Sequence, residues 1–228
     1  MSALAVGCAP DWADSGETYV VVSTDNDDGD GNIGEAGDYQ THVVYTSGGP
    51  CDWPEVAQLF YDCDSIAPNN FGSAYASRIA FPDDWEDTGT LFVGVVDCDY
   101  CSEPDVTPYI YTGGPGGDVY MVTVTSPPTA AIDMNVAGIV SGCVGIKPVD
   151  IISLDIMGDT DEASLIAGAF CCNKVYCSED GGWNWDASAK DPTGAWLTYA
   201  IWYEDTALAV TAGCEAAVSM CCGEDYPC

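Results

Sequence analysis

Residues 178–185, Ser-Glu-Asp-Gly-Gly-Trp-Asn-Trp, are the stretch that decides how the rest of this chain is interpreted. The Asp180 carboxylate can accept hydrogen bonds from the amides of a tight turn, and Gly181 and Gly182 permit positive φ there. Trp185 can pack back between neighbouring strands. Because the stretch follows a strand-like run at residues 173–177, it predicts the turn of a β-hairpin.

This turn resembles a motif of known fold. With Ser178, Asp180, Gly182 and Trp185 at its key positions, the stretch is similar to the Asp-box, or BNR repeat, of sialidase-type β-propellers, although Asn184 stands where Ser or Thr is usual. The resemblance implies an all-β fold, a β-propeller or propeller segment built from four-stranded antiparallel blades. It also implies that the Asp-box is a structural turn on the outside of a blade, and it names no reaction.

A repeating strand pattern agrees with blades. A strand, an acidic turn, an apolar strand and a hairpin follow one another at residues 78–124, 151–185 and 197–220. Blades recur about every 40–50 residues, so the chain holds roughly four or five of them. We expect one domain over residues 1–228, or a segment of a longer chain, with the Asp-box blade at about residues 149–190. A plain β-sandwich with acidic hairpin loops is the alternative.

The charge limits the possible partners. Asp and Glu number 37 against four Lys and Arg, a formal net charge of −33. Nucleic acid and anionic membrane surfaces are excluded, because almost nothing could neutralise their phosphates. The chain has no run long enough to span a membrane either. Repulsion of this size has to be offset by counterions, bound divalent metal or cross-links.

The cysteine content predicts disulfides and an extracellular or cell-surface location, because a reducing cytosol would keep so many thiols from forming disulfides. Zinc and redox chemistry remain alternatives; only residues 98–101 have Cys-x-x-Cys spacing. An odd count leaves at least one thiol free or joined to another chain. Residues 1–8 lack the pattern of a signal peptide. The disulfide candidates are Cys8, Cys51, Cys63, Cys98, Cys101, Cys143, Cys171, Cys172, Cys177, Cys214, Cys221, Cys222 and Cys228.

The acidic loop at residues 25–38 resembles the first half of an EF-hand or dockerin-type calcium loop, with oxygen ligands at alternate positions and glycine at the turn. Gly37 stands where a bidentate Glu should close that loop, and strands flank it instead of helices. A solvated acidic turn is the alternative. The predicted calcium ligands are Asn26, Asp28, Asp30, Asn32, Glu35 and Asp38.

Catalytic motifs are sparse. Sialidases bind the substrate carboxylate with three arginines, whereas Arg78 is the only arginine here. We therefore expect no sialidase activity. For Arg78 we expect a structural ion pair. Serine-nucleophile, Walker and zinc-protease motifs are absent, and the single histidine, His42, lies in a strand-like run. Glycosidase chemistry needs two carboxylates, and the sequence does not single out a pair among the candidates Asp83, Asp84, Glu86 and Asp87.

Together these features predict a non-catalytic extracellular structural protein. We expect it to self-assemble as a surface-layer or filament component, with disulfides and calcium stabilising the assembly. The alternative is a carbohydrate-binding or glycoside-hydrolase-like propeller.

Overall fold

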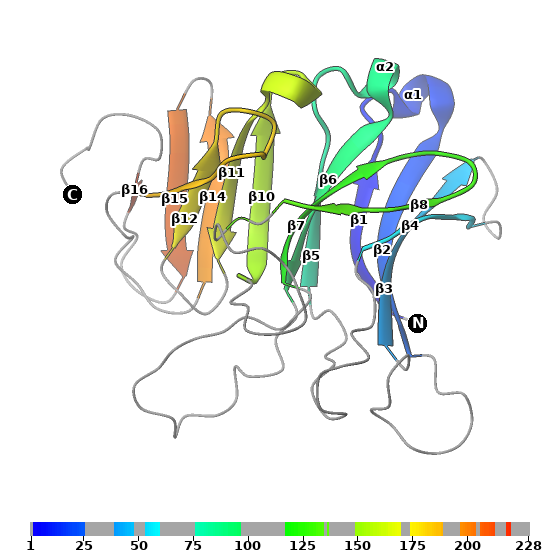
Figure 1. Ribbon diagram of the computed structural model, residues 1–228, viewed down its shortest axis with the longest axis horizontal. Helices are drawn as coiled ribbons and strands as arrows, with labels where there is room; N and C mark the ends of the chain where they lie inside the picture. The colour runs from blue at the N-terminus through cyan, green and yellow to red at the C-terminus, as the bar shows by residue number, and fades with distance from the viewer. Residues whose placement is uncertain are drawn as a thin grey trace.

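The computed structural model describes residues 2–25, 39–47, 53–59, 76–96, 117–134, 136, 149–169, 174–188, 197–203, 206–212 and 218–219. These residues form four sheets, here called blades A to D, which stand side by side as an open fan (Figure 1). Blades A and D lie at opposite ends of the row. The prediction of an all-β fold built from four-stranded antiparallel sheets is confirmed.

Blades A and B share one plan, in which a one-turn helix joins the first two strands. In blade A the strands are β1 (Ser2–Cys8), β2 (Glu17–Asp25), β3 (Tyr39–Ser47) and β4 (Glu55–Gln58), with α1 (Trp12–Ser15) after β1. In blade B they are β5 (Ala76–Ala80), β6 (Thr90–Val96), β7 (Asp118–Thr123) and β9 (Ile132–Asp133), with α2 (Trp85–Thr88) after β5. The connection from β7 to β9 contains β8 (Thr129–Ala130), which reaches back to pair in parallel with β4 of blade A.

Blades C and D repeat the plan with shorter turns. Blade C consists of β10 (Ile151–Met157), the 3₁₀ turn η1 (Thr160–Glu162), β11 (Ser164–Ala169), β12 (Val175–Ser178) and β13 (Asp186–Ala187). The described part of blade D is β14 (Leu197–Tyr203), β15 (Thr206–Ala212) and β16 (Val218–Ser219). The first strands contact one another in order, β1 with β5, β5 with β10 and β10 with β14.

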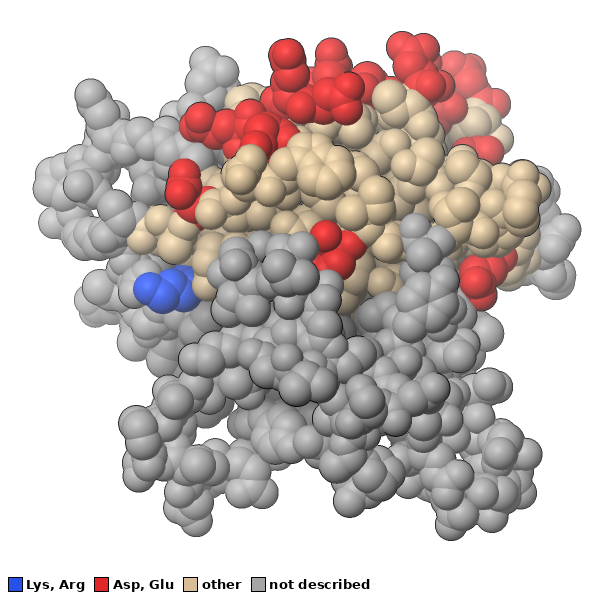
Figure 2. Space-filling view, in the orientation of Figure 1, with Lys and Arg blue, Asp and Glu red and all other residues tan. Residues whose placement is uncertain are grey.

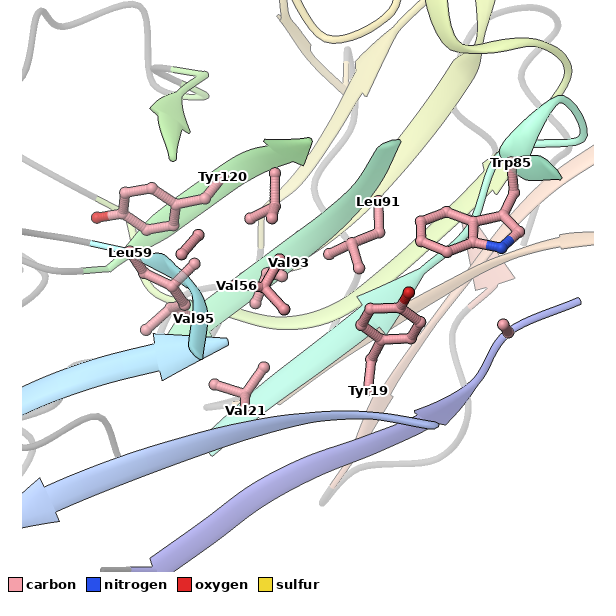
Figure 3. Close-up of a cluster of buried hydrophobic side chains, with 12 residues drawn as sticks. Tyr19, Val21, Val56, Leu59, Trp85, Leu91, Val93, Val95 and Tyr120 are labelled. Atoms are coloured by element: carbon pink, nitrogen blue, oxygen red, sulfur yellow. The ribbon is translucent and has the colours of Figure 1, made fainter. Parts of the chain in front are cut away.

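The core lies between the blades. Every residue of β6 is buried, because both faces of this strand are covered. Leu91, Val93 and Val95 pack toward blade A, where they join Tyr19 and Val21 of β2 in one apolar cluster (Figure 3). Phe92 points the other way and joins a second cluster with residues of blade C. Alternation along one strand thus supplies apolar side chains to two inter-blade cores.

The repeating pattern read from the sequence began at residue 78 and did not include blade A, although the β-branched runs at residues 18–23 and 41–46 predict its strands β2 and β3, and this is confirmed. A local signal for it exists: Asp11-Trp12-Ala13-Asp14-Ser15-Gly16 and Asp84-Trp85-Glu86-Asp87-Thr88-Gly89 share the form Asp-Trp-x-Asp-(Ser/Thr)-Gly. Both stretches fold into the same one-turn helix, capped by a left-handed glycine whose N–H donates to the tryptophan carbonyl at 2.8 Å. The motif therefore marks the turn between the first two strands of a blade.

Among the described residues, helices are limited to single turns, and none has the length and apolar character to cross a membrane.

Candidate functional site

The Asp-box residues lie together in the turn between β12 and β13. The Ser178 hydroxyl donates to Asp180 Oδ1 at 2.9 Å and accepts the N–H of Gly182 at 2.9 Å. Asp180 Oδ1 also accepts the N–H of Asn184 at 2.8 Å, and the Trp185 indole donates to the Gly182 carbonyl at 2.7 Å. Asn184 donates its side-chain amide to Asp180 as well, so it fills the place of the usual hydroxyl residue.

These contacts stabilise the Asp-box turn and lower the pKa of Asp180. Slight burial works to raise the pKa of Asp180, but the hydrogen bonds from Asn184 and Ser178 outweigh it and hold this pKa below its ordinary value. The turn also fixes the blade, because Gly181 donates its N–H to the Ala163 carbonyl at 3.0 Å. Trp185 packs against the cluster between blades B and C.

Gly181 is the position of this turn where a side chain is least tolerable. Its φ is +69°, and a Cβ there would lie 2.5 Å from the Thr160 carbonyl oxygen. We expect Gly181→Ala to lower the free energy of unfolding by about 2–5 kcal/mol, from backbone strain and the clash together. Gly16→Ala is the matched control, because Gly16 has a φ of +71° and no atom near the added Cβ. Denaturant unfolding measures both losses; equal losses would contradict the clash.

The loops between first and second strands carry acidic side chains to one end of the fan. Asp14 of α1, Glu86 and Asp87 of α2, and Asp161 and Glu162 of η1 are all exposed. Figure 2 shows acidic side chains gathered along the end of the molecule at which α1 and α2 lie in Figure 1.

Two acids at this end join blades B and C. Asp84 Oδ1 accepts the N–H of Thr160 at 2.9 Å and its hydroxyl at 2.7 Å, and Asp83 Oδ2 accepts the N–H of Gly158 at 3.2 Å. Asp83 and Asp84, considered above with Glu86 and Asp87 as a glycosidase pair, are therefore ties between blades. Glu86 and Asp87 are exposed side chains of α2.

Arg78 differs from its predicted role. This exposed residue of β5 donates from Nη1 to the carbonyl of Ser77 at 3.0 Å. In the described part of the chain it forms no ion pair with a carboxylate, so the predicted structural ion pair is not seen there.

The predicted calcium ligands, Asn26 to Asp38, lie outside the described residues, and so do all the cysteines except Cys8 and Cys177. Cys8 is exposed at the end of β1, and Cys177 is buried in β12. Over the described ranges, no three His, Cys, Asp or Glu side chains are grouped as ligands for a metal ion. The calcium site and the disulfides therefore stay predictions.

The opposite end of blade B contains a buried acid that sequence reasoning did not single out. Asp118 begins β7 and is only 4% exposed. Its Oδ1 accepts the N–H of Val119 at 2.8 Å and the N–H of Val136 at 3.0 Å. Both backbone donors bind Oδ1, which leaves Oδ2 to carry a proton.

Two further carboxyl groups adjoin Asp118. Asp150, which directly precedes β10 of blade C, is fully buried. It lies against the chain beside Asp118, because a Cβ added to Gly117 would be 2.1 Å from Asp150 Oδ1. Asp133 of β9 is half-buried and follows Ile132, which pairs with Met121 of β7. The three residues form what we call the acid cluster between blades B and C.

The acid cluster changes the protonation of Asp118. Burial is the largest effect and raises its pKa, the negative charge of Asp133 raises it further, and the two backbone hydrogen bonds oppose the rise only in part. Asp150 adds a smaller increase, and the resulting pKa is about 8. At neutral pH Asp118 is therefore mostly a neutral carboxylic acid, a form that can donate a proton.

This pKa makes stability depend on pH. Because the pKa of Asp118 is about 8 in the folded chain and 3.8 ordinarily, the folded chain holds an extra proton between these values. The free energy of unfolding should therefore fall as pH rises from about 4 to about 8, by on the order of a few kcal/mol. Asp118→Asn should remove this part of the slope in denaturant titrations. Asp186→Asn, at an exposed site, controls for loss of one charge; the same slope in Asp118→Asn and wild type would contradict the assignment.

Comparison with known proteins identifies no family for this chain. No protein-family model matches this chain, and no curated protein matches it in sequence. Among solved structures, a sialidase of Trypanosoma rangeli aligns over 90% of this chain and 34% of its own length, at 9% identity and a TM-score of 0.41. The chain thus spans about a third of that sialidase.

Two further solved structures are similar at the same level. A glucose dehydrogenase aligns over 98% of this chain and 82% of its own length, at 11% identity and a TM-score of 0.35. A GH32 β-fructofuranosidase of Bombyx mori in complex with sucrose aligns over 86% and 38%, at 11% identity and a TM-score of 0.34. All three are enzymes, and on that finding the prediction that this chain is not an enzyme is corrected.

Proposed function

We propose that this chain is a carbohydrate-active β-propeller-type protein that cleaves neutral glycans, with Asp118 as its general acid. The observation that carries the proposal is a buried carboxyl group with a pKa of about 8, placed beside two other carboxyl groups. Glycoside hydrolysis needs two carboxyl groups of unlike protonation, one to donate a proton and one to act as a base or nucleophile.

The roles follow from the surroundings of each group. Asp118 keeps its proton at neutral pH and would donate it from Oδ2 to the glycosidic oxygen as the C–O bond breaks. Asp133 is the least buried of the acid cluster and is the carboxylate within reach of solvent. It would accept a proton from the water whose oxygen bonds to the anomeric carbon. Fully buried Asp150 acts on Asp118, because its charge helps to keep the proton there.

The charge of the chain narrows the substrate. A net charge of −33 repels polyanionic glycans at a distance, so uronic-acid polymers and sulfated sugars are poor candidates. Neutral oligosaccharides meet no such electrostatic penalty. The proposal therefore concerns neutral sugars.

The setting of this activity is also proposed. Thirteen cysteines and the excess of acids support an extracellular or cell-surface location. Calcium at residues 26–38 and disulfides among the cysteines would offset repulsion between carboxylates there.

The test is a panel of neutral aryl glycosides and oligosaccharides, with release of leaving group or reducing ends as the readout. We expect at least one substrate to be cleaved, and its kcat/KM to fall as pH rises through about 8, where Asp118 of the free chain loses its proton. Heat-inactivated protein is the control. A panel in which no neutral glycan is either cleaved or bound would overturn the proposal.

A further inference from the structure

Two glycines on neighbouring strands of blade B face the start of blade C. Gly94 lies in β6 two residues after Phe92, so alternation along the strand places it on the same face, toward blade C. Gly117 directly precedes β7 and lies two residues before Val119, which belongs to the same cluster with blade C. The pairing of β6 with β7 sets Gly94 opposite Val119, so the two glycines lie near each other on one face.

These glycines contact two consecutive residues of blade C. A Cβ added to Gly94 would lie 2.8 Å from Cγ2 of Ile151, and one added to Gly117 would lie 2.1 Å from Oδ1 of Asp150 and 3.1 Å from its Cα. Neither glycine has a φ in the left-handed region, so the close approach of blade C, and not the backbone conformation, is what requires glycine here. We call Gly94 and Gly117 together the glycine notch.

The glycine notch fixes the position of a buried carboxyl group. Asp150 and Ile151 are both fully buried where β10 begins. Burying a carboxyl group costs free energy that burying an apolar side chain does not, so a close fit around Asp150 indicates a role besides packing. That role lies in the neighbouring Asp118, since Asp150 adjoins the chain directly before it.

The surroundings of Asp118 depend on this fit. Burial is the largest effect that raises the pKa of Asp118, and the described charged groups that raise it are Asp133 of β9 and, to a smaller extent, Asp150. Residues at the start of β10 contribute both burial and charge. A change that moves them away from blade B should therefore lower this pKa on both accounts.

We propose that Gly94 and Gly117 are positioning residues of the acid cluster, because the glycine notch holds Asp150 of blade C against the start of β7 and so determines the surroundings of Asp118. Neither glycine has a side chain that could act on a substrate; both act through Asp150 and Asp118. This inference rests on the proposed role of Asp118 as the general acid, and it adds the contact between blades that maintains that role.

Infrared difference spectra of the C=O band of protonated Asp118 test the proposal, because this band reports the proton whether or not a glycan is cleaved. Each variant is compared with its own Asp118→Asn double variant. In Gly94→Ala and in Gly117→Ala the added Cβ should push the start of β10 away, so we expect the midpoint of the band to fall from about 8 to about 7. On a cleaved glycoside, the fall in kcat/KM should move to lower pH by the same amount.

Gly7→Ala is the matched control. Its Cβ would lie 3.0 Å from Cε2 of Phe81, so this variant crowds the contact between blades A and B instead of the contact between B and C. It should leave the midpoint of the Asp118 band near 8 even where it lowers the free energy of unfolding. Near-ultraviolet circular dichroism shows which variants keep the native packing, and Gly94→Ala tests the notch from β6 where Gly117→Ala does not fold.

Two outcomes would overturn the proposal. One is a folded Gly94→Ala or Gly117→Ala variant whose midpoint stays near 8. The other is a midpoint in Gly7→Ala that falls as far as in these variants. A midpoint that falls as expected in a chain that cleaves no neutral glycan would support the positioning of Asp150 and count against the proposed cleavage alone.

Discussion

Replacing Asp118 by asparagine is expected to lower kcat on a neutral glycoside by at least about 100-fold, the usual contribution of a general acid. The amide side chain of this variant would retain an acceptor oxygen for the N–H groups of Val119 and Val136, which bind Oδ1 of the native aspartate. The turn at the start of β7 should therefore persist while the proton donor is lost. Steady-state kinetics from pH 5 to 10 are the measurement, and the fall in kcat/KM near pH 8 expected of the wild type should disappear in the variant.

The control for this experiment is Asp186→Asn, which removes one exposed carboxylate from β13. It should keep wild-type kcat and the wild-type pH profile. A substrate with an excellent leaving group adds a second check, because protonation of the leaving group matters little for it and Asp118→Asn should recover much of the lost rate. An Asp118→Asn variant with full activity on poor leaving groups would contradict the role of Asp118.

Trp85→Ala should cost about 3–5 kcal/mol in the free energy of unfolding, because it empties the aromatic centre of the core between blades A and B. Trp85 is 4% exposed and meets both Tyr19 and Phe81 edge-to-face. The loss combines burial of a large side chain with two ring contacts. Urea unfolding followed by far-ultraviolet circular dichroism measures it, and the m-value should stay unchanged.

Trp12→Ala is the matched control, since it removes the same residue from the same motif in blade A. Trp12 is 52% exposed, so the loss should be no more than about 1 kcal/mol when the protein is monomeric. The measurement belongs at low salt and low concentration for that reason. Similar losses in the free energy of unfolding for the two variants would contradict a stabilising role for the packing of Trp85 between blades A and B.

Local sequence signals were sufficient for much of the fold. Ser178, Asp180, Gly182 and Trp185 lie in one turn, and their contacts span seven residues or fewer, which is why a short motif carries the information. The apolar runs at residues 91–96 and 164–170 predict strands for the same reason, and the described residues there form β6 and β11. Strand β1, Ser-Ala-Leu-Ala-Val-Gly-Cys, was not predicted, because it has few β-branched residues and takes its strand form from pairing with β2.

The acids show where sequence reasoning stops. Asp83 and Asp84 look like solvated turn acids, yet they accept hydrogen bonds from Gly158 and Thr160, more than 70 residues away. Asp118 has no motif around it, and its altered pKa comes from burial and from Asp133, which the β7–β9 pairing brings near. Burial and charge between distant residues depend on how blades B and C pack, so composition and spacing do not reveal them.

The protonation of Asp118 is the central claim, and infrared difference spectroscopy tests it directly. Spectra of wild type minus Asp118→Asn, recorded from pH 5 to 10, isolate the C=O band of the protonated Asp118 carboxyl group. The account predicts that this band is present at neutral pH and disappears with a midpoint near 8. Absence of the band at pH 5 to 7, as for a carboxyl group with the ordinary pKa of 3.8, would contradict it.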